Sequence, residues 1–217
     1  MDFQLRWTYK SHGRSLDFQS AFTNGKEALL IAEDLLKTGR LKEITFVDEM
    51  NQSWTLKEMK KLLQEVKEQP HYVKAYFDGG FDLSTKKAGV GAVIYYRQNG
   101  KNYRLRSSAS FDELESNNEA EYAAFHYVVK QLEELGVHHL PVTFLGDSKV
   151  VLKQLAGEWP CYEESFNRWL DRIEEELEGL HIKPTYTHIA RKENEEADTL
   201  AAQALHGKEI SSTYEIE

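Results

Sequence analysis

Four acidic side chains occupy positions from which a fold could bring them to one shared site. Asp78 and Asp147 each follow an apolar, strand-like run, whereas Glu121 and Asp198 fall in the first turns of two helical patterns. Strand ends and first helical turns can meet at one edge of a sheet, where four carboxylates without cations would repel one another. Magnesium prefers oxygen ligands of this kind. The pattern therefore predicts a divalent-metal site, and in outline it is the site of a metal-dependent phosphodiesterase.

The two strand-end carboxylates each have a purely structural alternative. Asp78 is followed by Gly79 and Gly80, which allow a backbone to approach a ligand closely but are equally typical of a simple turn. Asp147 precedes a helical pattern, so it could be a helix N-cap, a metal ligand or both. Neither residue identifies the site alone.

Glu121 is distinguished from its neighbour Glu119 by its expected environment. Ser116 with Glu119 three residues later has the spacing of a capping box, which gives Glu119 a structural role. Glu121 instead lies on the helix face of Phe125 and Val128, the side expected to pack on a sheet, where a glutamate without a function is unusual. Glu121 is therefore the predicted ligand.

Asp198 shares a predicted helix face with small and apolar residues, namely Ala201, Ala202 and Leu205. Small side chains on that face permit a close approach between helix and sheet. We therefore expect this helix to bring Asp198 to the same sheet edge as the other three carboxylates.

The elements that must position these residues alternate along residues 70–206. The pattern predicts strands at 72–78, 88–97, 102–110, 141–146 and 182–189, and helices at 117–135, 148–156, 162–178 and 193–206. Three successive strands followed by alternating helices and strands indicate an α/β fold, with a mixed five-stranded sheet and helices on both faces. Residues 207–217 are polar and are predicted to be a disordered tail.

Residues 1–69 form a pattern of their own, which predicts a small α+β domain. Strands are expected at 3–9, 15–19, 44–47 and 53–55, with helices starting after Asn24 and spanning 56–68. The helix after Asn24 should end at Gly39. Pro70 disfavours helix in the residue before it, so the junction between the two domains is placed at Gln69–Pro70.

Composition restricts the class of protein. Hydrophobic residues make up 41% and aromatic residues 12% of the 217 residues, enough for packed cores, and the single Cys161 excludes an internal disulfide. No signal peptide and no membrane span is indicated, which predicts a cytoplasmic protein. The net charge of -9 argues against a protein that coats nucleic acid. Residues 1–69 contain 11 basic and 11 acidic residues, so the remaining 16 basic and 25 acidic residues place the whole excess in the second part.

Taken in order, the motifs closely resemble the type 1 ribonuclease H family over residues 71–206. The resemblance rests on Asp78-Gly-Gly, on Asn117-Asn118-x-Ala-Glu121-Tyr, on Gly-Asp147-Ser, and on His188 ten residues before Asp198. It implies a ribonuclease H-like fold. The implied activity is endonucleolytic hydrolysis of the RNA strand of RNA/DNA hybrids, leaving 5′-phosphate and 3′-hydroxyl ends.

The resemblance also implies roles for individual residues. Asp78, Glu121, Asp147 and Asp198 would hold two Mg²⁺ ions, which lie about 3.5–4 Å apart in two-metal sites, and Mn²⁺ could substitute. His188 would assist proton transfer and product release, although a lone histidine can equally be structural.

The implied substrate contacts lie beside the carboxylates. Asn117 and Asn118 would contact the hybrid in its minor groove, unless they only prolong the helix cap. The substrate-binding set also includes Gly79, Gly80 and Ser116, a serine at the motif's usual threonine.

One departure from the family leaves another function open. Residues 157–164 are acidic where many bacterial relatives carry a lysine-rich helix and loop, and phosphate binding needs Lys and Arg. A catalytically weak or inactive nucleic-acid-binding or scaffold module is therefore the alternative function. A 3′–5′ exonuclease of related fold would need a glutamate two residues after Asp78, where Gly80 stands. The domain at 1–69 could contact phosphates through Arg6, Trp7, Lys10 and Arg14, or could be a packing or protein-contact module.

Overall fold

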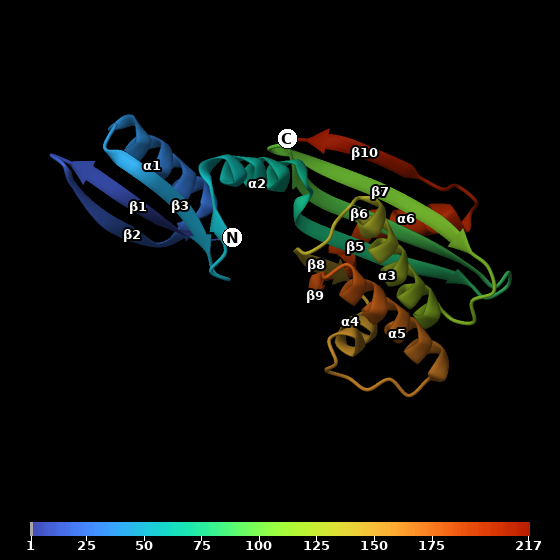
Figure 1. Ribbon diagram of the computed structural model, residues 1–217. Coiled ribbons are helices and arrows are strands. Elements are labelled where there is room, and N and C mark those ends of the chain that lie inside the picture. Colours follow the sequence, from blue (N-terminus) through green and yellow to red (C-terminus); the bar gives the residue numbers. More distant parts are fainter. Residues whose placement is uncertain (1) are drawn as a thin grey trace. The chain divides into compact units, whose positions relative to one another are not determined.

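The computed structural model describes residues 2–217, and these residues divide into two compact units between Glu68 and Gln69 (Figure 1). Each unit has its own sheet and its own buried hydrophobic cluster. Among residues 2–217, none of the helices combines the length and the apolar character that crossing a membrane requires.

The first unit is a four-stranded antiparallel sheet with two helices. Its elements are β1 (Asp2–Ser11), β2 (Arg14–Asn24), α1 (Gly25–Lys37), β3 (Leu41–Asp48), β4 (Ser53–Trp54) and α2 (Leu56–Glu68), and the strand order is β2-β1-β3-β4. Alternate residues Phe3 and Leu5 of β1 pack with Ala28 of α1 and Met59 of α2, so both helices share one core with the sheet. Asn24 caps α1 as expected, because its Oδ1 accepts a hydrogen bond from Lys26 N at 2.9 Å.

The second unit is built on a mixed sheet. Its elements are β5 (His71–Asp82), β6 (Lys87–Gln98), β7 (Lys101–Phe111), α3 (Asn117–Glu134), β8 (Pro141–Gly146), α4 (Lys149–Leu155), α5 (Glu164–Gly179), β9 (Lys183–His188), the 3₁₀ turn η1 (Arg191–Asn194), α6 (Glu195–Leu205) and β10 (Ser211–Ile216). The strand order is β10-β7-β6-β5-β8-β9. β5, β8 and β9 run parallel and the other pairs are antiparallel.

Helices cover both faces of this sheet, as expected (Figure 1). On β6, Ala92 and Ile94 belong to the large core that α3 and α5 share, whereas Val93 packs with Leu200 of α6 on the opposite face. Gly91 allows α6 to approach closely, since a Cβ there would lie 2.2 Å from the main-chain oxygen of Ala197. The first half of α6 thereby packs closely on β6.

The prediction that residues 207–217 form a disordered tail was wrong. The sheet has six strands rather than the expected five. β10 pairs antiparallel with β7 from Ser211 opposite Ser107 to Ile216 opposite Asn102. Its pairing is mostly main-chain hydrogen bonding at a sheet edge, which needs no apolar alternation and leaves little sign in a polar sequence. The second unit therefore continues beyond residue 206.

Candidate metal centre

Three of the predicted carboxylates lie together. One ligand oxygen each from Asp78, Glu121 and Asp147 falls within 4.8 Å of the other two. The parallel pairing of β5 and β8 explains part of this arrangement, because Tyr76 pairs with Leu145 and each stands two residues before a carboxylate. Asp78 and Asp147 thus reach the same level just beyond the paired segment of β5 and β8, although β5 itself continues to Asp82 rather than ending at Asp78 as expected.

Gly79 allows the third carboxylate to reach this place. A Cβ at Gly79 would lie 2.3 Å from the main-chain oxygen of Ala120 and 2.7 Å from the nitrogen of Glu121. No larger residue would fit without moving α3 away from β5. Gly79 therefore packs against the helix start, whereas a Cβ at Gly80 would meet open space.

The three carboxylates are electrostatically unfavourable as a group. Burial, then the charges of Asp147 and Asp198, raise the pKa of Asp78 to about 7, and only 7% of this residue is exposed. Burial, then the charges of Asp78 and Asp147, raise the pKa of Glu121 to about 9. The Glu121 Oε2 atom is also buried and lacks a hydrogen-bond partner.

These properties fit a hard divalent cation. The donors are all carboxylate oxygens, which Mg²⁺ and Mn²⁺ prefer. Burial and then mutual repulsion raise both pKa values; a cation would offset both effects, and the unpartnered oxygen of Glu121 could bind it. The site could therefore bind a divalent cation.

Asp198 lies near this centre but outside the tight group. Its charge contributes to the raised pKa of Asp78, yet its Oδ1 accepts a hydrogen bond from Nη2 of Arg191 at 2.9 Å. The expected helix face was right for Ala201, which is buried, and wrong for Ala202, which is exposed. The buried face of α6 runs through Ala197, Leu200, Ala201 and Ala204.

Asn194 is a site residue that the sequence interpretation missed. Only 1% of it is exposed, and its Nδ2 lies 2.9 Å from the Phe77 carbonyl oxygen and 3.3 Å from Oδ1 of both Asp78 and Asp147. Asn194 therefore donates to the β5 main chain and to the side chains of Asp78 and Asp147 from η1, the turn that precedes α6. Its position four residues before Asp198 in an otherwise acidic run was the available signal.

The start of α3 shows that Glu119 has a capping role. Ser116 is the N-cap, and its Oγ accepts a hydrogen bond from Glu119 N at 3.1 Å. The Glu119 side chain bonds one residue further back than a capping box requires, because its Oε2 accepts from Glu115 N at 2.8 Å. Its Oε1 accepts from Nε1 of Trp169 at 3.2 Å. Asn117 and Asn118 are exposed in the same turn.

His188 and Asp147 lie at one sheet edge. His188 is the last residue of β9, is exposed, and pairs with Gly146, the residue before Asp147. The N-cap of α4 is Ser148, so Asp147 does not have the capping role that was its structural alternative. This pairing places His188 level with the residue that precedes Asp147.

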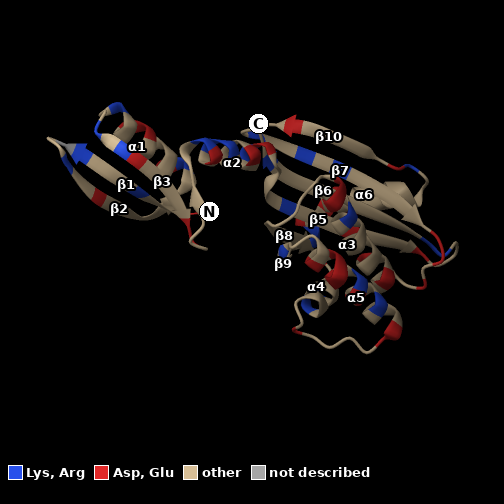
Figure 2. Cartoon of the chain, viewed as in Figure 1, with Lys and Arg blue, Asp and Glu red and all other residues tan. Residues whose placement is uncertain are grey.

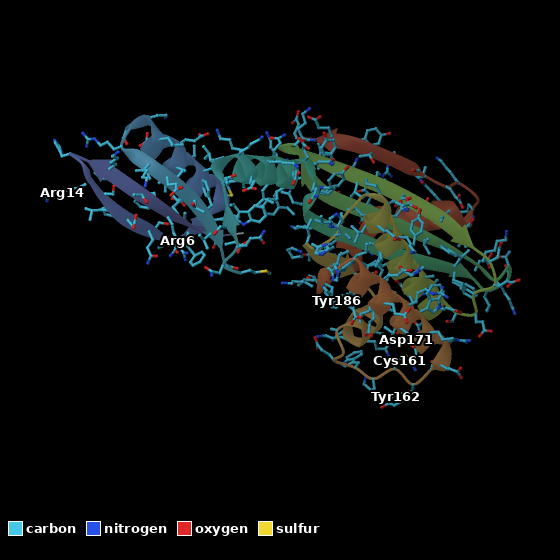
Figure 3. The ribbon with its side chains drawn as sticks, viewed as in Figure 1. Arg6, Arg14, Cys161, Tyr162, Asp171 and Tyr186 are labelled. Atoms are coloured by element: carbon cyan, nitrogen blue, oxygen red, sulfur yellow. The ribbon has the colours of Figure 1, made fainter. Side chains whose placement is uncertain are left out.

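The connection between α4 and α5 carries acidic and aromatic residues in place of a basic segment. Cys161 and Tyr162 lie on this connection (Figure 3). Lys149 Nζ lies 5.8 Å from the ring of Trp159, which is 43% exposed. Gln154 Nε2 donates to the Pro160 carbonyl at 2.9 Å and fastens the connection to α4.

Comparisons with known proteins agree with this fold. A family model described as "Reverse transcriptase-like" matches residues 76–204. An uncharacterized protein, YpeP, of Bacillus subtilis is 43% identical over 98% of this chain and 94% of its own length. A protein named Ribonuclease HI from Halobacterium salinarum is 32% identical over 61% of this chain and 64% of its own length.

Solved structures of RNase H1 proteins also match the fold of this chain. RNase H1 from H. salinarum superposes with a TM-score of 0.54 at 30% identity, covering 62% of this chain and 98% of that chain. LC11-RNase H1 in complex with an RNA/DNA hybrid gives a TM-score of 0.56 at 26% identity, covering 62% of this chain and 97% of that one.

Proposed function

The chain belongs to the reverse transcriptase-like family and, within it, to the type 1 ribonuclease H proteins, and from this membership we propose that it hydrolyses the RNA strand of RNA/DNA hybrids. The observation that carries the proposal is the close group of Asp78, Glu121 and Asp147, with ligand oxygens within 4.8 Å of one another. The name of the Halobacterium relative and the hybrid bound by LC11-RNase H1 support the choice of substrate.

The carboxylates would hold the metal in this reaction. Asp78, Glu121 and Asp147 fit divalent cations by donor type and by their closeness, Asp78 and Glu121 also by their raised pKa values, and Asp198 would be the fourth ligand. Two Mg²⁺ ions, or Mn²⁺ in their place, would supply Lewis acidity to the phosphodiester and to the attacking water. The products would carry 5′-phosphate and 3′-hydroxyl ends, since water attacks phosphorus and the 3′-oxygen leaves.

Other residues would orient the site and move protons. Asn194 donates to Asp78 and Asp147 and would hold both carboxylates in place as the substrate binds. His188 is exposed at the same sheet edge, and an imidazole there can accept and release a proton near neutral pH. We assign His188 an auxiliary role in proton transfer and product release.

The first turn of α3 would contact the hybrid. Asn117 and Asn118 are exposed beside the centre, and their amides can bond the 2′-hydroxyl and base edges that distinguish RNA from DNA. Ser116, Gly79 and Gly80 complete the proposed contact region, in which Gly80 leaves open space.

The first unit is proposed to be a binding module, and a cellular location is proposed from the cysteine content. The unit at 1–69 would bind either nucleic acid or a protein partner. The single cysteine fits a reducing compartment, and we propose the cytoplasm.

A non-catalytic hybrid-binding or scaffold module is the second candidate function. The observation in its favour is the acidic character of the connection between α4 and α5, with Glu158, Glu163 and Glu164 exposed. Weak phosphate contacts there would lower affinity for a polyanion.

A cleavage assay separates the two functions. Labelled RNA/DNA, RNA/RNA and DNA/DNA duplexes are incubated with the protein in Mg²⁺, in Mn²⁺ and in EDTA. We expect cleavage of the RNA strand of the hybrid alone, dependent on the metal and abolished by Asp78→Asn. Hybrid binding without cleavage in either metal would favour the scaffold, and cleavage retained by Asp78→Asn would contradict the site.

A further inference from the structure

A polar pocket lies between the start of α3 and the first half of α5. Its lining residues are Glu119, Ser165, Arg168, Trp169 and Arg172. Glu119 stands in the same helical turn as the exposed Asn117 and Asn118, and two residues before Glu121. The pocket therefore borders the surface proposed above for the hybrid.

The two arginines of this pocket are available to a ligand. Arg168 and Arg172 are four residues apart on α5, so they share one helix face, and both are exposed. Within residues 2–217, neither guanidinium forms an ion pair with a carboxylate. Figure 2 shows that α5 carries both basic and acidic positions.

Trp169 organises the pocket. Its Nε1 donates to Glu119 Oε1 at 3.2 Å, and its edge meets the ring of His126 with centroids 5.5 Å apart. The Arg172 guanidinium lies over the indole, 5.3 Å from the ring centroid. A guanidinium that stacks on an aromatic ring keeps its N–H groups free for hydrogen bonds. Because its side chain is already ordered, it loses less conformational entropy when it binds phosphate.

The one carboxylate in the pocket does not cancel the arginines. Both oxygens of Glu119 already accept hydrogen bonds, from Glu115 N and from Trp169 Nε1. One negative and two positive side chains leave the lining with a net positive charge. The Ser165 hydroxyl adds a neutral donor at the same place.

We infer that Arg168 and Arg172 bind the phosphate backbone of the nucleic-acid substrate. This inference rests on the proposed function, because the pocket borders the surface that is proposed to contact the hybrid. Arginine recognises phosphate through paired N–H groups. The arginines of α5 thus supply phosphate contacts that the acidic connection at 157–163 cannot supply.

A matched pair of double variants tests the inference. Arg168→Gln/Arg172→Gln removes two positive charges from the pocket. Lys183→Gln/Lys208→Gln removes the same charge at exposed positions, at the start of β9 and after α6, away from the metal centre. Both are made in the Asp78→Asn background, so that hydrolysis does not disturb the measurement, and circular dichroism verifies that each folds.

Binding of a fluorescent RNA/DNA hybrid is then measured by anisotropy between 50 and 200 mM salt. The arginine variant should bind roughly tenfold more weakly at low salt, and its slope of log affinity against log salt should be smaller by about 2 units. The lysine variant should match its parent. Arg168→Lys/Arg172→Lys should retain the slope but bind more weakly than arginine, because lysine cannot form paired N–H contacts.

The outcomes separate the two proposals. Equal affinities and slopes for the arginine and lysine variants would overturn the phosphate-binding role. If the protein with all carboxylates intact fails to cleave hybrids while arginine-dependent binding is observed, the inference stands and the proposed hydrolysis fails.

Discussion

Arg191 donates a hydrogen bond from Nη2 to Oδ1 of Asp198 at 2.9 Å, and this contact separates Asp198 from the three carboxylates that share a site. The guanidinium is mostly exposed, and its charge lowers the pKa values of Asp78 and Glu121 against the effect of burial. Arg191 therefore acts in part as a substitute positive charge beside the metal centre. A cation that uses Asp198 as a ligand must compete with it.

Replacing Arg191 should make the protein depend more on its metal. Arg191→Gln is expected to lower the melting temperature in EDTA at pH 8, because the carboxylates lose a compensating charge, and to enlarge the increase in melting temperature on adding Mg²⁺. Lys192→Gln removes the same charge from the same 3₁₀ turn and is the control. Equal Mg²⁺ responses in both variants would show that Arg191 does not compete at the centre.

In the metal-free protein, Asp78 and Glu121 should contribute less and less stability as the pH rises from about 4 to about 9. The folded-state pKa of Asp78 is raised to about 7 and that of Glu121 to about 9, so the folded state keeps protons that the unfolded chain has already released. The stability that these two groups contribute is therefore fully present below the unfolded pKa values of 3.8 and 4.5 and is lost as the pH rises through the folded ones. Urea unfolding in EDTA at several pH values measures this.

Asp78→Asn isolates one part of that pH dependence. The variant should be more stable than the parent in EDTA at pH 8, by an amount on the order of a few kcal/mol, and should differ little at pH 4. Mg²⁺ should stabilise the parent more than the variant. A variant less stable than its parent at pH 8 would mean that repulsion at Asp78 is not the dominant effect.

Glu121→Gln and Glu119→Gln should have opposite consequences although the residues are two positions apart. Glu121→Gln should abolish metal-dependent cleavage, because it removes a ligand whose Oε2 has no other partner. Glu119→Gln should retain cleavage and cost at most about 1 kcal/mol of stability, since it weakens only the cap and the Trp169 contact. Reversed results would show that the roles of the two glutamates are exchanged.

Asn194→Ala should affect the centre more than the fold. The variant leaves Phe77 O, Asp78 and Asp147 without a buried donor, which should cost roughly 1–3 kcal/mol. The Mg²⁺ concentration for half-maximal cleavage should rise, because the two carboxylates lose their fixed orientation. An unchanged Mg²⁺ requirement, measured by titration with saturating hybrid, would restrict Asn194 to a structural role.

Removing residues 1–68 should weaken binding without abolishing the reaction. Residues 69–217 have their own sheet and core, so we expect the shortened protein to fold and to cleave hybrids with a higher Michaelis constant on long substrates. Its affinity should also fall less steeply with salt, by about one unit of slope for each phosphate that residues 1–68 bind in the full chain. Equal constants and slopes would assign residues 1–68 to packing or to a protein partner.

The sequence was most informative where local pattern and site coincide. Asp78 and Asp147 could be placed because each ends an apolar run, and parallel strands bring such ends to one edge. Glu121 could be chosen over Glu119 because helical periodicity separates the packed face from the capping turn. These inferences needed only near neighbours in the chain.

Other features depend on contacts between distant segments. The side-chain amide of Asn194 connects η1 with β5 and with the residue that follows β8. Its local sequence does not indicate that Phe77 and Asp147 lie near it. The pairing of Arg191 with Asp198 depends on the path of η1 rather than on spacing. For the same reason the sequence alone does not distinguish the arginines of α5 within their acidic surroundings.

The C-terminal strand has a consequence for how the protein behaves at high concentration. β7 is 11 residues long, and β10 occupies its outer side, with Lys101 and Glu215 joined by an ion pair at 2.7 Å. A strand of that length without a neighbour is a template for pairing between molecules. Proteolytic trimming before Ser211 would therefore uncover the edge of β7 and promote aggregation through it.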